Sequence, residues 1–360
     1  MAEHQLFEAA TFVAPPPAPD LAEDVLVEQT QGYFAPKRLM LVAGRSNAHL
    51  AERIARRLQV TCSSVTLKTF PSGELYARYD ESIRGADVFI VQSFAPANGM
   101  SVNDFLIELL VMVDAAHLGS AKRVTAVVPL FPYARQDKKS RPREPITARL
   151  VSTLLNAAGV DRVLTMDLHA GQVQGFFDGP VDHMTALPMF AQYFRDQGIS
   201  GDNVCVVSAD AGRTKLAKKF AEMLDASLAI ISKDRPTHSV AEVIDVIGAE
   251  KVRGRVAIIS DDMIDTAGTL CAGAEAVKRA GARRVIACAT HPIFSPPALE
   301  RITNSALDQV VVSDTVPVDP VTRPQKVTVL PADGILAQTI DNIFREGSVS
   351  EIFGGENQLF

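Results

Sequence analysis

The segment 261–269 contains the residue types needed to bind a sugar phosphate. Asp261 and Asp262 follow the apolar run Val256–Ile259, and Asp265 opens a stretch Asp-Thr-Ala-Gly-Thr before an Ala-rich helical pattern. A turn of small and hydroxyl residues between a strand and a helix directs free backbone N–H groups toward an anion. The aspartates would repel a bare phosphate, but they would accept hydrogen bonds from sugar hydroxyls or contact a metal ion. The alternative is a strand end with solvated acids and a threonine helix cap.

Polar side chains follow other apolar runs that have the composition of buried strands. Ligands of open α/β sheets bind at the carboxyl ends of the strands, so these groups are candidates for a shared site. An aspartate there can hold magnesium, and two cations on a strand-to-loop exit can close over phosphates. The alternatives are solvated charges, a structural histidine and an aspartate that caps a helix. The groups are Arg135 with Gln136, His169, Asp210, and Lys233 with Arg235.

Strand and helix patterns alternate along the chain, which predicts an α/β fold with mostly parallel sheets covered by helices. The pattern restarts in the second half, so we expect two similar domains with a site between them. The expected strands are 39–43, 65–70, 88–92, 124–131, 163–168, 204–208, 228–232, 256–260, 285–290 and 310–313. The expected helices are 48–58, 102–118, 147–158, 186–195, 215–224, 270–280 and 335–344.

The composition excludes several classes of protein. A chain of 360 residues with 47% hydrophobic and 22% charged residues is ordinary for a globular protein of two domains. The net charge of −6 argues against general nucleic-acid binding. The four cysteines are scattered, which favours a reduced cytoplasm over a metal site or disulfide framework. The most apolar helical pattern carries Glu108 and Asp114 and is too short for a membrane span.

Several motifs, in matching order, resemble the ribose-phosphate diphosphokinases, also called PRPP synthetases, of the type I phosphoribosyltransferase superfamily. They are Phe131-Pro132-Tyr133-Ala134-Arg135-Gln136-Asp137, Thr165-Met166-Asp167-Leu168-His169, Gln174-Gly175-Phe176-Phe177 and the acidic turn at 261–269. Residues 1–37 are rich in proline and acids and are interpreted as a flexible extension. The resemblance implies phosphoribosyltransferase-like domains at 38–182 (ATP side) and 183–345 (ribose 5-phosphate side). A C-terminal tail occupies 346–360.

The resemblance also implies a reaction: transfer of the diphosphoryl group of ATP to the C1 hydroxyl of ribose 5-phosphate, which gives PRPP and AMP. Its product would serve nucleotide, histidine and tryptophan biosynthesis. The implied cofactor is Mg²⁺, held near His169 and Asp210, and the implied catalytic pair is Lys233 and Arg235. The implied ATP-binding residues are Phe70, Ser72, Gly73, Glu74, Arg135 and Gln136. The implied ribose 5-phosphate-binding residues are Arg235, Asp261, Asp262, Asp265, Thr266, Ala267, Gly268 and Thr269.

In relatives of this kind the loop around Phe70 serves the site of a neighbouring subunit, which implies self-association, as a homohexamer built from dimers. The chain departs from the usual family pattern at Ser72, Ala209, Arg213 and Ala267. Since alanine adopts positive φ poorly, we expect a right-handed backbone at Ala267. Two other functions remain open: a non-catalytic regulatory relative of the synthetases, and a phosphoribosyltransferase that consumes PRPP.

Overall fold

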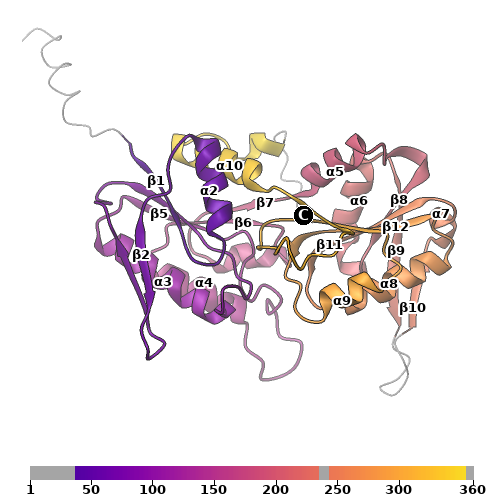
Figure 1. Cartoon of the computed structure of the whole chain (residues 1–360), viewed down its shortest axis with the longest axis horizontal. Helices are drawn as coiled ribbons and strands as arrows, with labels where there is room; N and C mark the ends of the chain where they lie inside the picture. Colours follow the sequence, from indigo (N-terminus) through magenta and orange to yellow (C-terminus); the bar gives the residue numbers. More distant parts are fainter. Residues whose placement is uncertain (1–36, 235–242, 354–360) are drawn as a thin grey trace, which may run out of the picture. The chain divides into compact units, whose positions relative to one another are not determined.

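The computed structural model describes residues 37–234 and 243–353 (Figure 1). Its first sheet has five parallel strands in the order β1-β4-β5-β6-β7. The expected parallel arrangement is therefore confirmed for this half of the chain. The strands are β1 (Leu39–Ala43), β4 (Asp87–Val91), β5 (Arg123–Val127), β6 (Arg162–Met166) and β7 (Val181–Met184). The helices of this half are α2 (Ala48–Leu58), α3 (Val102–Leu118) and α4 (Thr147–Ala158).

The second sheet has seven strands in the order β10-β9-β8-β11-β12-β13-β14, and β10 is the strand that runs antiparallel to its neighbour. The strands are β8 (Val204–Ser208), β9 (Ser227–Asp234), β10 (Val243–Ile247), β11 (Val256–Ile264), β12 (Arg284–Pro292), β13 (Gln309–Ser313) and β14 (Val327–Leu330). The helices are α5 (Leu187–Asp196), α6 (Thr214–Met223), α7 (Ala249–Val252), α8 (Gly268–Arg279), α9 (Ala298–Thr303) and α10 (Asp333–Arg345).

Local sequence accounts for the helix ends of the first half. Asn47 accepts a hydrogen bond from the backbone of Leu50 at the start of α2, and Ser101 forms a capping box with Asp104 at the start of α3. Gly159 ends α4 in the left-handed conformation that glycine adopts without strain. The central strands β4 and β8 are buried along their whole length, as parallel strands covered on both faces must be.

One buried apolar cluster joins the two halves of the chain. It includes Leu41 and Ile54 from the first half, Phe194 and Phe220 from the second, and Ile340 of α10. Figure 1 shows α10 beside α2, and the two helices are in contact. The final helix therefore packs on the first half of the chain, although it follows the second sheet in sequence.

The strand expected at 65–70 is not part of the parallel sheet. β2 (Val65–Thr69) pairs antiparallel with β3 (Leu75–Tyr79), a strand that the sequence did not predict. The expectation was wrong because a short alternation of apolar and polar residues is equally compatible with a strand of a separate hairpin and with a strand of the parallel sheet. Strands β7, β10 and β14 and helices α7 and α9 were not predicted either. In the part of the chain that the structure describes, no helix has the length and hydropathy of a membrane span.

Candidate active site

The acidic pair lies within a strand rather than in the turn after it. β11 continues to Ile264, and Asp261 pairs in register with Ala289 of β12. The expected end of the strand was wrong because β12 also continues, to Pro292, and supplies backbone partners for the extra residues. Since side chains alternate along a strand, the two acids differ: Asp262 is buried, whereas Asp261 is partly exposed.

The turn that follows has a left-handed residue at its centre. Ala267 has φ 58° and ψ 5°, so the right-handed backbone expected there was wrong. The chain must turn from β11 into α8 within three residues, and the Ala267 carbonyl accepts the Cys271 N–H at 2.9 Å. A left-handed non-glycine residue costs about 1–2 kcal/mol, which the packing of the buried Ala267 side chain offsets. Thr266 lies in the turn, and Gly268 and Thr269 open α8 with free N–H groups.

The guanidinium of Arg213 lies among the acids and a histidine. It forms an ion pair with Asp262 and lies 4.0 Å from an oxygen of Asp261. It also donates to the carbonyl oxygen of His169 at 3.1 Å. The His169 ring nitrogen Nδ1 is 2.8 Å from the Asp262 carboxylate. Residues of β11, of the loop after β6 and of the segment before α6 therefore meet at one point.

The pKa values of the two neighbouring carboxyl groups shift in opposite directions. Burial and the adjacent charge of Asp262 raise the pKa of Asp261 well above its usual range. Burial also opposes ionisation of Asp262, but the hydrogen bond from His169 and the charge of Arg213 outweigh it and lower the pKa of Asp262. Near neutral pH, Asp262 is therefore the firmly ionised member of the pair.

His169 Nδ1 has two polar neighbours. The Asp262 carboxylate, which only accepts hydrogen bonds, is 2.8 Å away, and the Arg213 guanidinium, which only donates, is 3.1 Å away. The shorter contact, with Asp262, favours the tautomer that carries the proton on Nδ1 and leaves the lone pair on Nε2. Histidines that bind metals commonly donate their other N–H to a carboxylate in this way. Asp210 accepts the backbone N–H of Arg213 at 2.9 Å, as a helix cap. Among the described residues, no group of three or more His, Cys, Asp or Glu side chains is arranged to hold a metal ion.

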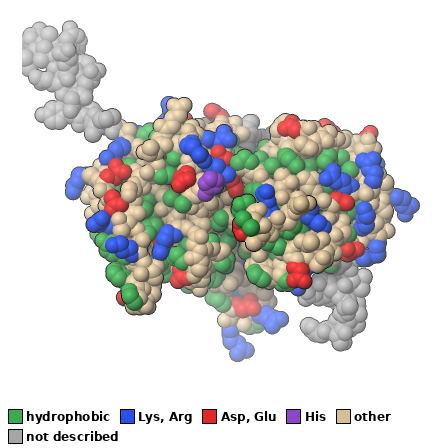
Figure 2. Space-filling model, viewed as in Figure 1, with side chains coloured by type: hydrophobic (Ala, Val, Ile, Leu, Met, Phe, Trp, Pro, Cys, Tyr) green, Lys and Arg blue, Asp and Glu red, His purple; other side chains and the backbone are tan. Residues whose placement is uncertain are grey.

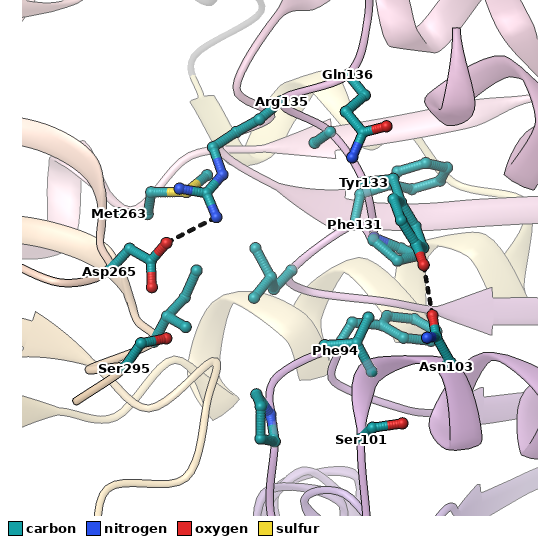
Figure 3. Close-up of a pocket in the computed structure, with 16 residues that line it drawn as sticks. Phe94, Ser101, Asn103, Phe131, Tyr133, Arg135, Gln136, Met263, Asp265 and Ser295 are labelled. Atoms are coloured by element: carbon teal, nitrogen blue, oxygen red, sulfur yellow. Dashed lines mark hydrogen bonds and ion pairs between the residues drawn. The ribbon is translucent and has the colours of Figure 1, made fainter. Parts of the chain in front are cut away.

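A cavity of about 430 Å³ opens next to the acidic turn (Figure 3). Arg135 reaches across it from the loop after β5 and forms an ion pair of 2.7 Å with Asp265. Burial opposes ionisation of Asp265, but hydrogen bonds from Ser295 and Arg135 lower its pKa. Gln136 also lines the cavity, and its side-chain oxygen accepts the Thr147 hydroxyl at 2.6 Å. The cavity thus has a cation and an amide on one side and the acidic turn on the other.

Comparison with known proteins gives this arrangement a family. Residues 39–159 match the N-terminal domain of ribose phosphate pyrophosphokinase, and residues 237–354 match the phosphoribosyl synthetase-associated domain. A ribose-phosphate pyrophosphokinase of Fusobacterium nucleatum is 47% identical over 313 residues, which cover 87% of this chain and 97% of the relative. The chain belongs to the ribose-phosphate pyrophosphokinase family.

Two further relatives agree with that assignment. A ribose-phosphate pyrophosphokinase of Corynebacterium efficiens is 46% identical over 321 residues, covering 89% of this chain and 97% of the relative. The crystal structure of phosphoribosylpyrophosphate synthetase from Mycobacterium smegmatis aligns with a TM-score of 0.79 at 43% identity. That alignment covers 86% of this chain and 100% of the other. The two-sheet α/β fold is therefore the fold of the pyrophosphokinase family.

The residues expected at an adenine site do not line this cavity. Phe70, Ser72, Gly73 and Glu74 form the tip of the β2–β3 hairpin, which Figure 1 shows extending away from the sheets. The hairpin supplies none of the described residues that line the cavity. The Phe70 ring is 48% exposed, and the Ser72 hydroxyl donates to the Glu74 carboxylate at 2.8 Å. Within one chain, this part of the expected pyrophosphokinase site is separate from the rest.

The expected catalytic pair lies at the edge of what the structure describes. Lys233 is near the end of β9, where its backbone pairs in register with Ile244 of β10. Arg235 lies outside the described residues. Lys233 therefore lies on the second strand from the edge of the second sheet, between β10 and β8.

Some site residues could not be found from sequence. The side-chain contacts of Arg213 depend on three segments that are distant in the chain, and no local pattern predicts them. Ser295 lines the cavity and comes shortly after the carboxyl end of β12. A search for polar residues after each strand could therefore have identified it. His291, near the end of β12, is buried, and its Nε2 donates to the Met166 carbonyl at 3.0 Å.

Proposed function

We propose that this chain transfers the diphosphoryl group of ATP to the C1 hydroxyl of ribose 5-phosphate, and that the reaction occurs between Arg135 and the turn at 265–269. The observation that carries the proposal is the Arg135–Asp265 ion pair of 2.7 Å across the cavity. The ion pair places Arg135, an expected nucleotide-binding residue, in direct contact with Asp265, an expected sugar-phosphate-binding residue. The products are PRPP and AMP, for nucleotide, histidine and tryptophan biosynthesis.

The ribose 5-phosphate binds on the second sheet. Its 5-phosphate accepts hydrogen bonds from the free N–H groups of residues 266–269 at the start of α8, where the helix dipole also favours an anion. The hydroxyls of its ribose donate hydrogen bonds to Asp261 and Asp262. The nearby guanidinium of Arg213 offsets the negative charge of these two acids. The left-handed residue Ala267 directs these N–H groups to one side of the turn.

ATP binds on the first sheet, with its phosphates near Arg135 and Gln136. His169 and Asp210 would hold Mg²⁺: the two candidate ligands are neighbours of the same residue, since the His169 carbonyl and the Asp210 carboxylate both accept hydrogen bonds from Arg213. Magnesium usually takes one or two protein ligands and completes its shell with phosphate oxygens and water. When bound, it neutralises charge on the triphosphate chain.

The chain's own residues then supply positioning and charge. The C1 hydroxyl attacks the β-phosphorus of ATP, the bond from that phosphorus to the α-phosphate oxygen breaks, and AMP leaves while the hydroxyl loses its proton. Charge builds on the transferred group, and Lys233 and Arg235 stabilise it. Removing a cation with this role in phosphoryl transfer costs roughly 10³–10⁵ in rate.

A second copy of the chain completes the adenine end of the site. The exposed hairpin tip carries an aromatic face in Phe70 and an acceptor in Glu74, neither of which lies at the cavity of its own chain. Stacking on Phe70 and a hydrogen bond from the adenine amino group to Glu74 would hold the base. The assembly we propose is a homohexamer built from dimers, in the cytoplasm.

The test is AMP formation from Mg-ATP and ribose 5-phosphate by the purified full chain. Lys233→Ala should lose at least about a thousandfold in rate. The matched control is Lys218→Ala, since Lys218 is an exposed lysine on α6 that pairs with Glu222 and should leave the rate unchanged.

Two outcomes would replace the proposal. Wild-type protein that forms no AMP, under conditions that activate a known synthetase, would be a regulatory relative. Formation of a nucleotide from PRPP and a free base would instead identify a phosphoribosyltransferase.

A further inference from the structure

Arg213 is an unusually enclosed cation. Its side chain is only 10% exposed, and it lies at the junction of η3 (Ala211–Arg213) and α6. The guanidinium also borders a small cavity of about 20 Å³, which Asp167, Ser260 and Thr290 help to line. A cation is expensive to bury unless it is paired, so its partners must hold it there.

The partners of Arg213 are the groups that a divalent cation would use. Asp262 is its ion-pair partner, Asp261 is 4.0 Å away, and the backbone carbonyl of His169 accepts from it at 3.1 Å. Two carboxylates and a carbonyl oxygen are hard ligands of the kind that Mg²⁺ and Mn²⁺ prefer. In this chain a planar guanidinium already occupies the space between them.

The fork of the guanidinium suits this position better than a point charge would. Its Nη2 contacts both Asp262 and the His169 carbonyl, while its Nε lies 4.0 Å from Asp261, so the planar group faces both acids at once. Asp262 in turn holds the His169 ring at 2.8 Å. Arg213 therefore fixes Asp262 directly and His169 both directly and through Asp262.

We propose that Arg213 is a positioning residue that serves as the resident cation of the acidic pair, so that no divalent cation binds between Asp261, Asp262 and His169 in this chain. It orients Asp262 and His169 and leaves Asp261 as the more accessible carboxylate for the sugar. This rests on the proposed function for its consequence in catalysis, but its test of metal binding does not depend on turnover.

The experiment measures Mn²⁺ binding to the nucleotide-free full chain by electron paramagnetic resonance. Arg213→Gln should bind one Mn²⁺ about tenfold or more tightly than wild type, because two carboxylates lose their cation. Adding Asp262→Asn to that variant should abolish the gain. Equal Mn²⁺ binding by wild type and Arg213→Gln would overturn the proposal, as would a gain that survives Asp262→Asn.

Arg213→Lys keeps the charge and guards against a variant that fails to fold. It should bind Mn²⁺ no more tightly than wild type does, yet raise the KM for ribose 5-phosphate severalfold with a smaller change in kcat, since a single ammonium nitrogen cannot contact Asp262 and His169 and also face Asp261. Wild-type KM in Arg213→Lys would refute the positioning role. The control is Arg123→Lys, at the partly buried ion pair with Asp87 outside the site, which should change neither quantity.

The two proposals fail separately. If wild-type protein forms no AMP, the proposed function fails while the Mn²⁺ comparison still stands. If wild-type protein forms AMP but Arg213→Gln gains no Mn²⁺, only the resident-cation proposal fails.

Discussion

The Arg135–Asp265 ion pair leads to a quantitative prediction about ATP binding. To contact a phosphate of ATP, Arg135 must give up its partner, so the pair opposes nucleotide binding. The two side chains are 53% and 24% exposed, which places them among the partly solvated pairs worth about 0.2–1 kcal/mol. Replacing Asp265 with asparagine should therefore tighten ATP binding by a factor of up to about five.

The assay is calorimetric titration with a non-hydrolysable ATP analogue and magnesium, without ribose 5-phosphate. Asp265→Asn should bind the analogue more tightly than wild type. The same variant should raise the KM for ribose 5-phosphate, because Asp265 opens the turn that we propose holds the sugar phosphate. The opposite shifts for the two substrates would separate this effect from a general loss of structure.

A double-mutant cycle tests whether the effect of Asp265→Asn on ATP binding depends on Arg135. Removing any acid near the phosphates lowers repulsion, so a gain alone would not show that Arg135 is responsible. In an Arg135→Gln background, Asp265→Asn should no longer tighten binding. Unchanged or weaker ATP binding in the single variant, or the same gain in both backgrounds, would refute the reasoning.

Three further predictions concern stability, backbone and assembly. Burial lowers the pKa of His183 to about 4, so as the pH falls the unfolded chain binds a proton at this histidine before the folded chain does. Stability should therefore fall by about 1.4 kcal/mol per pH unit as pH drops from about 6.5 toward 4, measured by urea unfolding; a flat profile would contradict a neutral buried histidine. Ala267→Gly should keep the free energy of unfolding within about 1 kcal/mol, because relief of the left-handed strain is offset by the flexibility of glycine; a loss above about 2 kcal/mol would contradict that backbone. Mixing inactive Phe70→Ala and Lys233→Ala chains should restore about a quarter of wild-type activity if two copies build each site, and none if one copy does.

On the face drawn in Figure 2, lysine and arginine side chains are interspersed with acids rather than gathered into one broad basic surface. Arg135 and Arg213, two basic residues of the proposed site, form individual ion pairs with Asp265 and Asp262.

Where local signals were strong, sequence predicted the fold well. The helices 48–58, 102–118 and 147–158 have the expected bounds because caps and a left-handed glycine mark their ends. The strands that were missed, such as β7 and β14, are only four residues long and largely half-buried. A strand of that length gives too few alternations to be distinguished from a loop.

The same limit applies to the site: patterns within one segment could be recognised in the sequence, whereas contacts between distant segments could not. The acidic turn and the strand-end residues were identified from their own segments, and the structure brings Arg135 to Asp265 and His169 to Asp262. The conformation of Ala267 was mispredicted because intrinsic preference was weighed without the geometry of the turn, which requires positive φ.

Buried hydrogen bonds between the two sheets determine which part of the site can respond to substrate. The Thr290 hydroxyl donates to Asp167 at 2.6 Å, and His291 donates to the Met166 carbonyl at 3.0 Å. These donors and acceptors are all buried, and leaving such a group unpaired costs about 1–3 kcal/mol. These bonds therefore hold the two sheets together near His169, whereas the partly exposed Arg135–Asp265 pair can open at little cost. Substrate binding should accordingly rearrange the cavity side chains while the base of the site keeps its geometry.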